Sequence, residues 1–133
     1  MYIEDNKELL DFVSNKLSSD YVIYNSDGSN AIEYILGIIP DIIICDLNLP
    51  TSNGFQISST VKKDLRTSHI PIIILTASDD QESYVKALES GADVFLTKPF
   101  DLKVLKQSIK SLLFNREKLR FYYTNHIENI INY

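Results

Sequence analysis

The chain has 133 residues, 44% of them hydrophobic and 23% charged, which is the balance of a globular protein with a single domain and core. Its formal net charge of −5, without any dense basic cluster, argues against direct nucleic-acid binding by this segment. The single cysteine cannot form an internal disulfide, and no apolar run approaches the length of a membrane span. The N-terminus also lacks the pattern of a signal peptide. We therefore expect a cytoplasmic protein whose residues make no membrane contact.

Short apolar segments alternate along the chain with segments of helical period. The expected strands are residues 2–3, 21–24, 42–45, 72–75 and 94–96. Continuous runs such as Ile42–Cys45 are typical of parallel strands that helices cover on both faces. The expected helices carry apolar stripes at Leu9, Leu10, Val13 and Leu17, at Ala31, Ile32, Ile35 and Leu36, and over residues 55–65, 79–90 and 101–114.

The helix boundaries carry local signals of their own. Asp5-Asn6 and Asp79-Asp80 are candidate N-caps, and Gly91 is a candidate C-cap. A strand followed by a helix, five times over, implies right-handed crossovers. The sequence therefore predicts an α/β fold, with a doubly wound parallel sheet of five strands and helices on both faces.

Polar residues stand where the predicted strands end, and ligands of open α/β sheets bind at those ends. Glu4-Asp5 ends the first strand, Asp46 the third and Thr76 the fourth, and Lys98 follows the fifth. Clustered carboxylates repel one another unless a cation joins them, and Mg²⁺ prefers such oxygen ligands. A carboxylate beside Mg²⁺ and a lysine can attack phosphorus, so the sequence predicts a phosphoryl-transfer site. Cys45 should point to the opposite side of the sheet from Asp46 and pack against helices.

Several sequence blocks, in order, resemble the receiver domains of two-component response regulators. The blocks are Glu4-Asp5-Asn6, Pro40–Pro50, Gly54-Phe55, Ile70–Ala77 and Gly91–Phe100. Each block is weak alone, but all of them in register at strand ends are specific. The resemblance covers residues 1–114 and implies a flavodoxin-like fold with strand order 2-1-3-4-5. It is closest to the receivers of hybrid histidine kinases that carry a DNA-binding domain downstream.

The resemblance also implies roles for individual residues. Asp46 would be the phosphoacceptor, assisted by Lys98 and Thr76. Mg²⁺ would be held by Glu4, Asp5, Asp46 and the backbone carbonyl of Asn48. Thr76 and Phe95 would form the switch pair, although Phe95 could instead be a static core residue. Asn48 and Ser78 would tune the lifetime of the phosphoryl group, and Pro99 is expected to follow a cis peptide bond.

Two features depart from the family pattern. Only Met1, Tyr2 and Ile3 precede the acidic pair, where the family has a longer first strand. Either the short first strand makes the sheet less stable, or residues are missing before Met1, and we favour the second interpretation. Ser52-Asn53 stand where the family often has Met-Asp, a change of surface loop that should leave the chemistry intact.

Residues 115–133 lie outside the five strand–helix units. Seven residues lie at spacings of 3, 4 or 7, as in one long helix with an apolar seam: Leu105, Ile109, Leu112, Leu119, Tyr123, Ile130 and Tyr133. Arg116 and His126 fill the remaining seam positions and weaken it. The segment is therefore either a dimerising helical extension or a linker toward an output domain, and the receiver domain is residues 1–114.

The predicted function is a phosphoacceptor switch rather than an enzyme. Its expected partners are a histidine kinase or phosphotransfer domain, an attached output domain that regulates transcription, and a second copy bound through the fourth helix, fifth strand and fifth helix or through the C-terminal helix. An aspartyl-phosphate hydrolase is the first alternative, but it needs a second Asp where Asn48 stands. A degenerate receiver that only docks is the second, but it should have lost Asp46 or Lys98.

Overall fold

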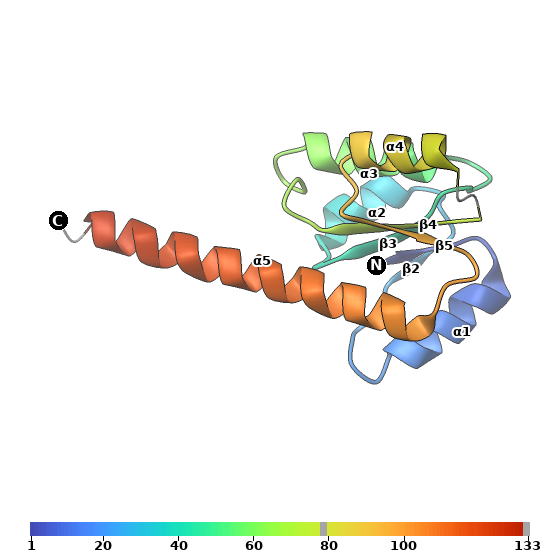
Figure 1. Cartoon of the computed structure of the whole chain (residues 1–133), viewed down its shortest axis with the longest axis horizontal. Coiled ribbons are helices and arrows are strands. Elements are labelled where there is room, and N and C mark those ends of the chain that lie inside the picture. The colour runs from blue at the N-terminus through green and yellow to red at the C-terminus, as the bar shows by residue number, and fades with distance from the viewer. Residues whose placement is uncertain (78–79, 132–133) are drawn as a thin grey trace.

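A computed structural model of the chain describes residues 1–77 and 80–131 (Figure 1). Five strands alternate with five helices. The strands are β1 Tyr2–Ile3, β2 Asn25–Ser26, β3 Ile43–Asp46, β4 Ile72–Thr76 and β5 Val94–Thr97. The helices are α1 Lys7–Leu17, α2 Ala31–Ile38, α3 Gly54–Lys63, α4 Gln81–Glu89 and α5 Leu102–Ile131. No helix in the described ranges is long and apolar enough to cross a membrane.

All five strands are parallel and form one sheet in the order β2-β1-β3-β4-β5. The predicted fold class and strand order are thus confirmed. The prediction of a strand over Tyr21–Tyr24 is wrong, because β2 is Asn25–Ser26. β2 pairs only with the two residues of β1, so Tyr21–Tyr24 precede the paired part of the strand. The amide of Tyr2 donates a hydrogen bond to the Tyr24 carbonyl.

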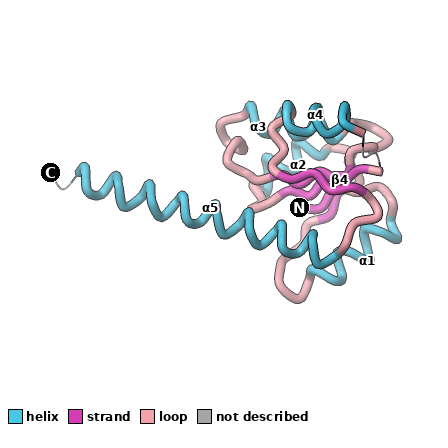
Figure 2. The backbone as a smooth tube through the Cα atoms, in the orientation of Figure 1, coloured by secondary structure: helices cyan, strands magenta, loops and turns pink. Residues whose placement is uncertain are grey.

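Helices cover both faces of the sheet (Figure 2), and an apolar layer packs on each face. One face packs on α2 and α3 through Ile35 and Ile57. Ile43 and Cys45 of β3 lie in this layer. The other face packs on α1 and α5 through Val13 and Leu105. Burial of these runs on both faces is what parallel strands without alternation require. Cys45 lies among Ile35 and Ile57 and not with α1, as predicted.

The helix starts agree with the capping signals. The Asn6 side chain accepts a hydrogen bond from the Leu9 amide, and the Asp80 side chain accepts one from the Ser83 amide. These side chains satisfy amides that the first turn of a helix leaves without partners. After α4, Gly91 takes a positive φ of 85°, as expected of a C-cap glycine. Asp79, the other acid proposed as a cap, lies outside the described residues.

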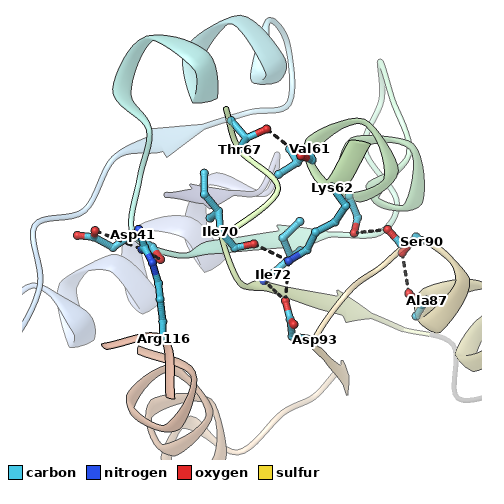
Figure 3. A network of polar contacts seen from close by, with 11 residues as sticks. Asp41, Val61, Lys62, Thr67, Ile70, Ile72, Ala87, Ser90, Asp93 and Arg116 are labelled. Atoms are coloured by element: carbon cyan, nitrogen blue, oxygen red, sulfur yellow. Dashed lines mark hydrogen bonds and ion pairs between the residues drawn. The ribbon is translucent and has the colours of Figure 1, made fainter. Parts of the chain in front are cut away.

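A polar network at the amino ends of the strands fixes the loops to the helices (Figure 3). The Lys62 ammonium donates to the Ile70 carbonyl at 2.7 Å and pairs with Asp93 at 3.2 Å. Asp93 also accepts the Ile72 amide at 2.8 Å. Arg116 of α5 donates to the Asp41 carbonyl at 2.8 Å. These contacts lie at the sheet edge opposite to the carboxyl ends. The Lys62 and Asp93 contacts join α3 to β4 and to the residues before β5, and the Arg116 contact separately joins α5 to the residues before β3.

The fifth helix does not stop near residue 114. It is one α-helix of 30 residues, whose first half packs under the sheet and whose second half extends beyond the body (Figure 1). The segment expected as either a helical extension or a linker is therefore helical through Ile131. The division of the chain into a receiver at 1–114 and a separate tail remains a prediction.

Candidate functional site

Three carboxylates converge at the carboxyl ends of β1 and β3. These strands are neighbours, and the chain order reverses between them, which is where open α/β sheets bind ligands. Glu4 and Asp5 follow β1, and Asp46 ends β3. One carboxylate oxygen from each of the three residues lies within 4.8 Å of the others. Glu4 and Asp46 are buried, with 1% and 6% exposed, whereas Asp5 is open to solvent.

Lys98 is the cation within this cluster. Its ammonium lies 2.8 Å from Oε1 of Glu4 and 3.0 Å from Oδ1 of Asp46. The Lys98 amide donates to the Thr76 carbonyl at 2.6 Å, which fixes the backbone beside β4. Burial lowers the pKa of Lys98, but the hydrogen bonds to Glu4 and Asp46 outweigh it, so the pKa is raised. The lysine therefore stays charged and offsets the repulsion between two buried acids. The Lys98-Pro99 peptide bond is cis, as predicted.

Alternation along parallel strands explains why these groups meet. The side chains that point toward α1 and α5 include those of Tyr2, Ile44, Val94 and Leu96. Because every second residue of a strand faces the same side, Glu4, Asp46 and Lys98, two residues further along, lie on that side too. The second carboxylate oxygen of Glu4 accepts hydrogen bonds from the amides of Asp5 and Asn6 at 3.1 and 3.4 Å. The turn into α1 thus holds Glu4 in place.

The donor set fits a magnesium ion. Three carboxylates at one open rim supply hard oxygen ligands, and exposed Asp5 leaves that rim accessible to water, which Mg²⁺ retains when it binds. Glu4, Asp5 and Asp46 are the residues that would hold the ion. Asn48, whose carbonyl was the fourth predicted ligand, is exposed in the loop after β3 and forms an isolated bridge with Asn53.

The predicted switch residues lie on the other face of the sheet. Thr76 is fully buried at the end of β4, and in the register of β4 with β5 it lies opposite Thr97. Phe95 precedes Thr97 by two residues, so Thr76 and Phe95 share one face. The Phe95 ring is partly buried and meets Tyr84 of α4 edge to face, with ring centroids 5.8 Å apart. Ser78, the second residue predicted to tune lifetime, lies outside the described residues.

Sequence reasoning missed how closely α3 approaches β3. Gly54 begins α3, and its amide donates to the Leu47 carbonyl at 2.8 Å. A Cβ at Gly54 would lie 2.7 Å from the Asp46 carbonyl oxygen, so this position has no room for a side chain. Asn53, expected in a surface loop, caps α3 by accepting the Phe55 amide at 2.7 Å. An Asn directly before Gly-Phe was the available signal for this helix start.

Comparison with known proteins agrees with this geometry. The model of the response regulator receiver domain family matches residues 1–110. Histidine kinase P4 of Formosa agariphila is 36% identical over 94% of the chain, which spans only 9% of that protein. The DNA-binding dual master transcriptional regulator RpaA of Synechocystis is 31% identical over 90% of the chain, which spans 50% of it.

A solved structure shares the fold along nearly the whole domain. The signal receiver domain of a signal transduction histidine kinase from Syntrophus aciditrophicus superposes with a TM-score of 0.79 at 30% identity, and covers 86% of this chain and 88% of its own. The family match includes all five strands and both buried acids of the cluster. This chain belongs to the response regulator receiver domains of two-component signalling.

Proposed function

We propose that the chain is a phosphoacceptor switch in which Asp46 takes a phosphoryl group from a histidine kinase or its phosphotransfer domain. One observation carries the proposal: Asp46 is a buried carboxylate that lies 3.0 Å from the Lys98 ammonium and within 4.8 Å of two further acids. A buried carboxylate without such neighbours would be protonated rather than nucleophilic.

The residues divide the chemistry between them. A carboxylate oxygen of Asp46 forms a bond to phosphorus, and the bond from phosphorus to the donor breaks with its electron pair leaving on the donor. Lys98 offsets the negative charge on the phosphoryl oxygens, and the Thr76 hydroxyl donates a hydrogen bond to one of them. Mg²⁺, when held by Glu4, Asp5 and Asp46, supplies further neutralisation of that charge.

Such a protein is not an enzyme in the ordinary sense. It catalyses its own phosphorylation and the loss of its own phosphoryl group. The hydrolase alternative is disfavoured because Asn48 cannot act as the acid or base that a second aspartate would provide. The docking-only alternative is disfavoured because both Asp46 and Lys98 are present and are paired.

The response to phosphorylation would pass through Thr76 and Phe95, which share one face of adjacent strands. Thr76 would move toward the phosphoryl group, and the Phe95 ring would turn inward, away from Tyr84 of α4. The face formed by α4, β5 and α5 would then change its affinity for an output domain or a second copy. Tyr84 and Leu88 of α4 are about half exposed on this face. The similarity to RpaA supports transcription regulation as the output.

The phospho-donor would dock beside Lys98. A groove of about 390 Å³ there is lined by α1 and the start of α5: Leu9, Phe12, Val13, Lys98, Pro99, Phe100 and Leu102. Phe12 is 56% exposed, and its apolar surface suits a helix of a kinase or phosphotransfer domain. We expect this phosphoryl transfer to take place in the cytoplasm, where the phosphohistidine of a histidine kinase or phosphotransfer domain would be the donor.

The experiment is phosphorylation by a small phospho-donor, measured by intact mass with and without Mg²⁺. Wild type should gain one phosphoryl group only when Mg²⁺ is present, and Asp46→Asn should gain none. Asp20→Asn, which removes an exposed acid outside the cluster, is the matched control and should be phosphorylated like wild type. An adduct that persists in Asp46→Asn, or that forms equally without the ion, would refute the proposal.

A further inference from the structure

Helix α4 is held on the sheet by few buried side chains. It lies on the same side of the sheet as α3 (Figure 1), and of its nine residues, all of which the structure describes, only Ala87 is buried. The larger apolar side chains of α4 stay partly in solvent: Tyr84 is 50%, Val85 43% and Leu88 55% exposed. A helix that buries so little apolar surface opens locally at a lower cost in free energy than the core does.

Buried hydrogen bonds at Ser90 fix the C-terminal end of α4. The Ser90 carbonyl accepts a hydrogen bond from the Ser58 hydroxyl of α3 at 3.1 Å. The Ser90 hydroxyl donates to the Ala87 carbonyl at 2.6 Å (Figure 3). Because both bonds are buried, breaking them would leave polar groups without partners. This end of α4 is therefore tied to α3 and to its own last turn.

Tyr84 joins the N-terminal half of α4 to the sheet. Its ring meets the Phe95 ring edge to face, with centroids 5.8 Å apart and an angle of 80° between the ring planes. Phe95 of β5 lies opposite Ile74 of β4 in the register of the two strands, and it packs against the same apolar layer as Ile74. An edge-to-face arrangement is favourable for an aromatic pair beyond the area that the pair buries. The contact therefore couples the free half of α4 to the residue predicted to switch.

Phe95 carries no polar atom that would favour its partly exposed position. A tyrosine at this place could keep its hydroxyl in solvent, but a phenylalanine ring gains nothing from exposure to water. The Tyr84 ring gives the Phe95 ring a favourable partner at the surface instead. The outward position of Phe95 therefore depends on a side chain of α4.

We propose that the ring contact between Tyr84 and Phe95 stabilises the unphosphorylated arrangement of the domain and so limits how readily Asp46 holds a phosphoryl group. This inference rests on the proposed function, in which Phe95 turns inward and away from Tyr84. Breaking the ring contact is then part of the cost of that change. By linkage, a substitution that removes the contact must favour the phosphorylated arrangement by the same factor. Tyr84 is a positioning residue, because it acts through Phe95 and not on the phosphoryl group.

Binding of beryllium fluoride, which imitates a phosphoryl group on a carboxylate, tests the linkage. In calorimetry with Mg²⁺ present, Tyr84→Ala should bind beryllium fluoride about twofold to tenfold more tightly than wild type, the range expected for an aromatic pair. Tyr84→Phe keeps the ring and should bind as wild type does.

Val85→Ala is the matched control for this measurement. Val85 is about as exposed as Tyr84, but its side chain points about 100° away around the helix, and alanine raises the helix propensity at both positions. Val85→Ala should therefore bind beryllium fluoride like wild type. An affinity of Tyr84→Ala equal to that of wild type, or the same gain in Tyr84→Phe or Val85→Ala, would overturn the proposal.

Hydrogen exchange tests the ring contact without any ligand. In Tyr84→Ala the amides of Val85 and Lys86 should exchange about twofold to tenfold faster than in wild type, because the N-terminal half of α4 opens more readily. The amides of Gly91 and Ala92, which donate to carbonyls at the fixed end of the helix, should keep their rates. Unchanged exchange at Val85 and Lys86 would refute the inference alone. Absence of beryllium fluoride binding by wild type would instead refute the proposed function, so the two failures are distinguishable.

Discussion

Gly54 lies against the backbone of Asp46 so closely that a methyl group on it would sit 2.7 Å from the Asp46 carbonyl oxygen and 2.9 Å from the Cα of Leu47. Because the obstructing atoms are backbone, they cannot turn aside as a flexible side chain would. Gly54→Ala should therefore displace α3 from β3, and we expect a loss of about 1–3 kcal/mol in the free energy of unfolding.

Urea unfolding of this variant checks the expectation, and Gly37→Ala is its control. Gly37 lies in α2, and no neighbouring atom lies within 4 Å of the place that a Cβ would take, so alanine there should stabilise the helix by about 0.5–1 kcal/mol. Equal stability of the two variants would show that the contact with Asp46 has no cost.

Ile39 ends α2 in the left-handed conformation, with a φ of 52°. This conformation costs an L-residue with a branched side chain roughly 1–2 kcal/mol, whereas Asn tolerates it. Ile39→Asn should raise the melting temperature, since the isoleucine side chain is only partly covered. Ile38→Asn, one residue earlier and inside the helix, should lower it. Calorimetry of both variants decides whether conformation or burial dominates at this turn.

Lys98 is the cation between two buried acids, so its removal should matter most when no divalent ion is present. In metal-free buffer Lys98→Met should lose more than about 1 kcal/mol of stability, because Glu4 and Asp46 are left facing each other without compensation. Added Mg²⁺ should restore part of the loss, since binding to the folded state stabilises it.

Lys86→Met tests whether any lysine would behave in this way. Lys86 forms an exposed pair with Glu82 at 3.3 Å, and its loss should change stability by less than about 0.5 kcal/mol with no dependence on Mg²⁺. Thermal melts of both variants with and without the ion make the comparison. A deficit in Lys98→Met that Mg²⁺ leaves unchanged would contradict a shared role of lysine and metal.

Burial raises the pKa of the Cys45 thiol above its ordinary value of 9.0, with Asp46 and Glu4 as lesser causes. As pH rises, the thiol ionises at a lower pH in the unfolded chain than in the folded chain. Its contribution to the free energy of unfolding is therefore fully present below pH 9.0 and is lost as pH rises above 9.0. Near pH 9.0 a thiol reagent should label Cys45 slowly in the folded chain and rapidly in urea. An Asn15→Cys variant, whose added thiol is exposed on α1, should show one fast and one slow reaction.

The cluster at the carboxyl ends of the strands was largely predictable from sequence because its signals are local. An apolar run that stops at Asp46 fixes both a buried strand and the acid at its end, and parallel strands bring such ends together. The same alternation placed Cys45 on the opposite face. None of this required knowledge of the long-range packing.

What sequence reasoning missed depends on neighbours far away in the chain. β2 forms at Asn25–Ser26 because β1 offers only two positions for pairing, while the more apolar residues 21–24 lie before the ladder. Close approach to Asp46 is set by where α3 begins, which the sequence pattern of Gly54 alone does not reveal. For residues 115–133 the sequence left a helical extension and a linker open; Arg116 bonds to Asp41 across 75 positions, and the helix continues.

The unbroken α5 has a mechanical consequence. A helix of 30 residues is about 45 Å long, and its first turns follow directly on the loop that carries Lys98. Arg116 binds Asp41 at mid-length, so about half of the helix packs on the sheet and about half extends beyond the body. Because an unbroken helix is stiff, a shift of the half that packs on the sheet would be carried to the far end as a shift of similar size, without unfolding of the helix between them.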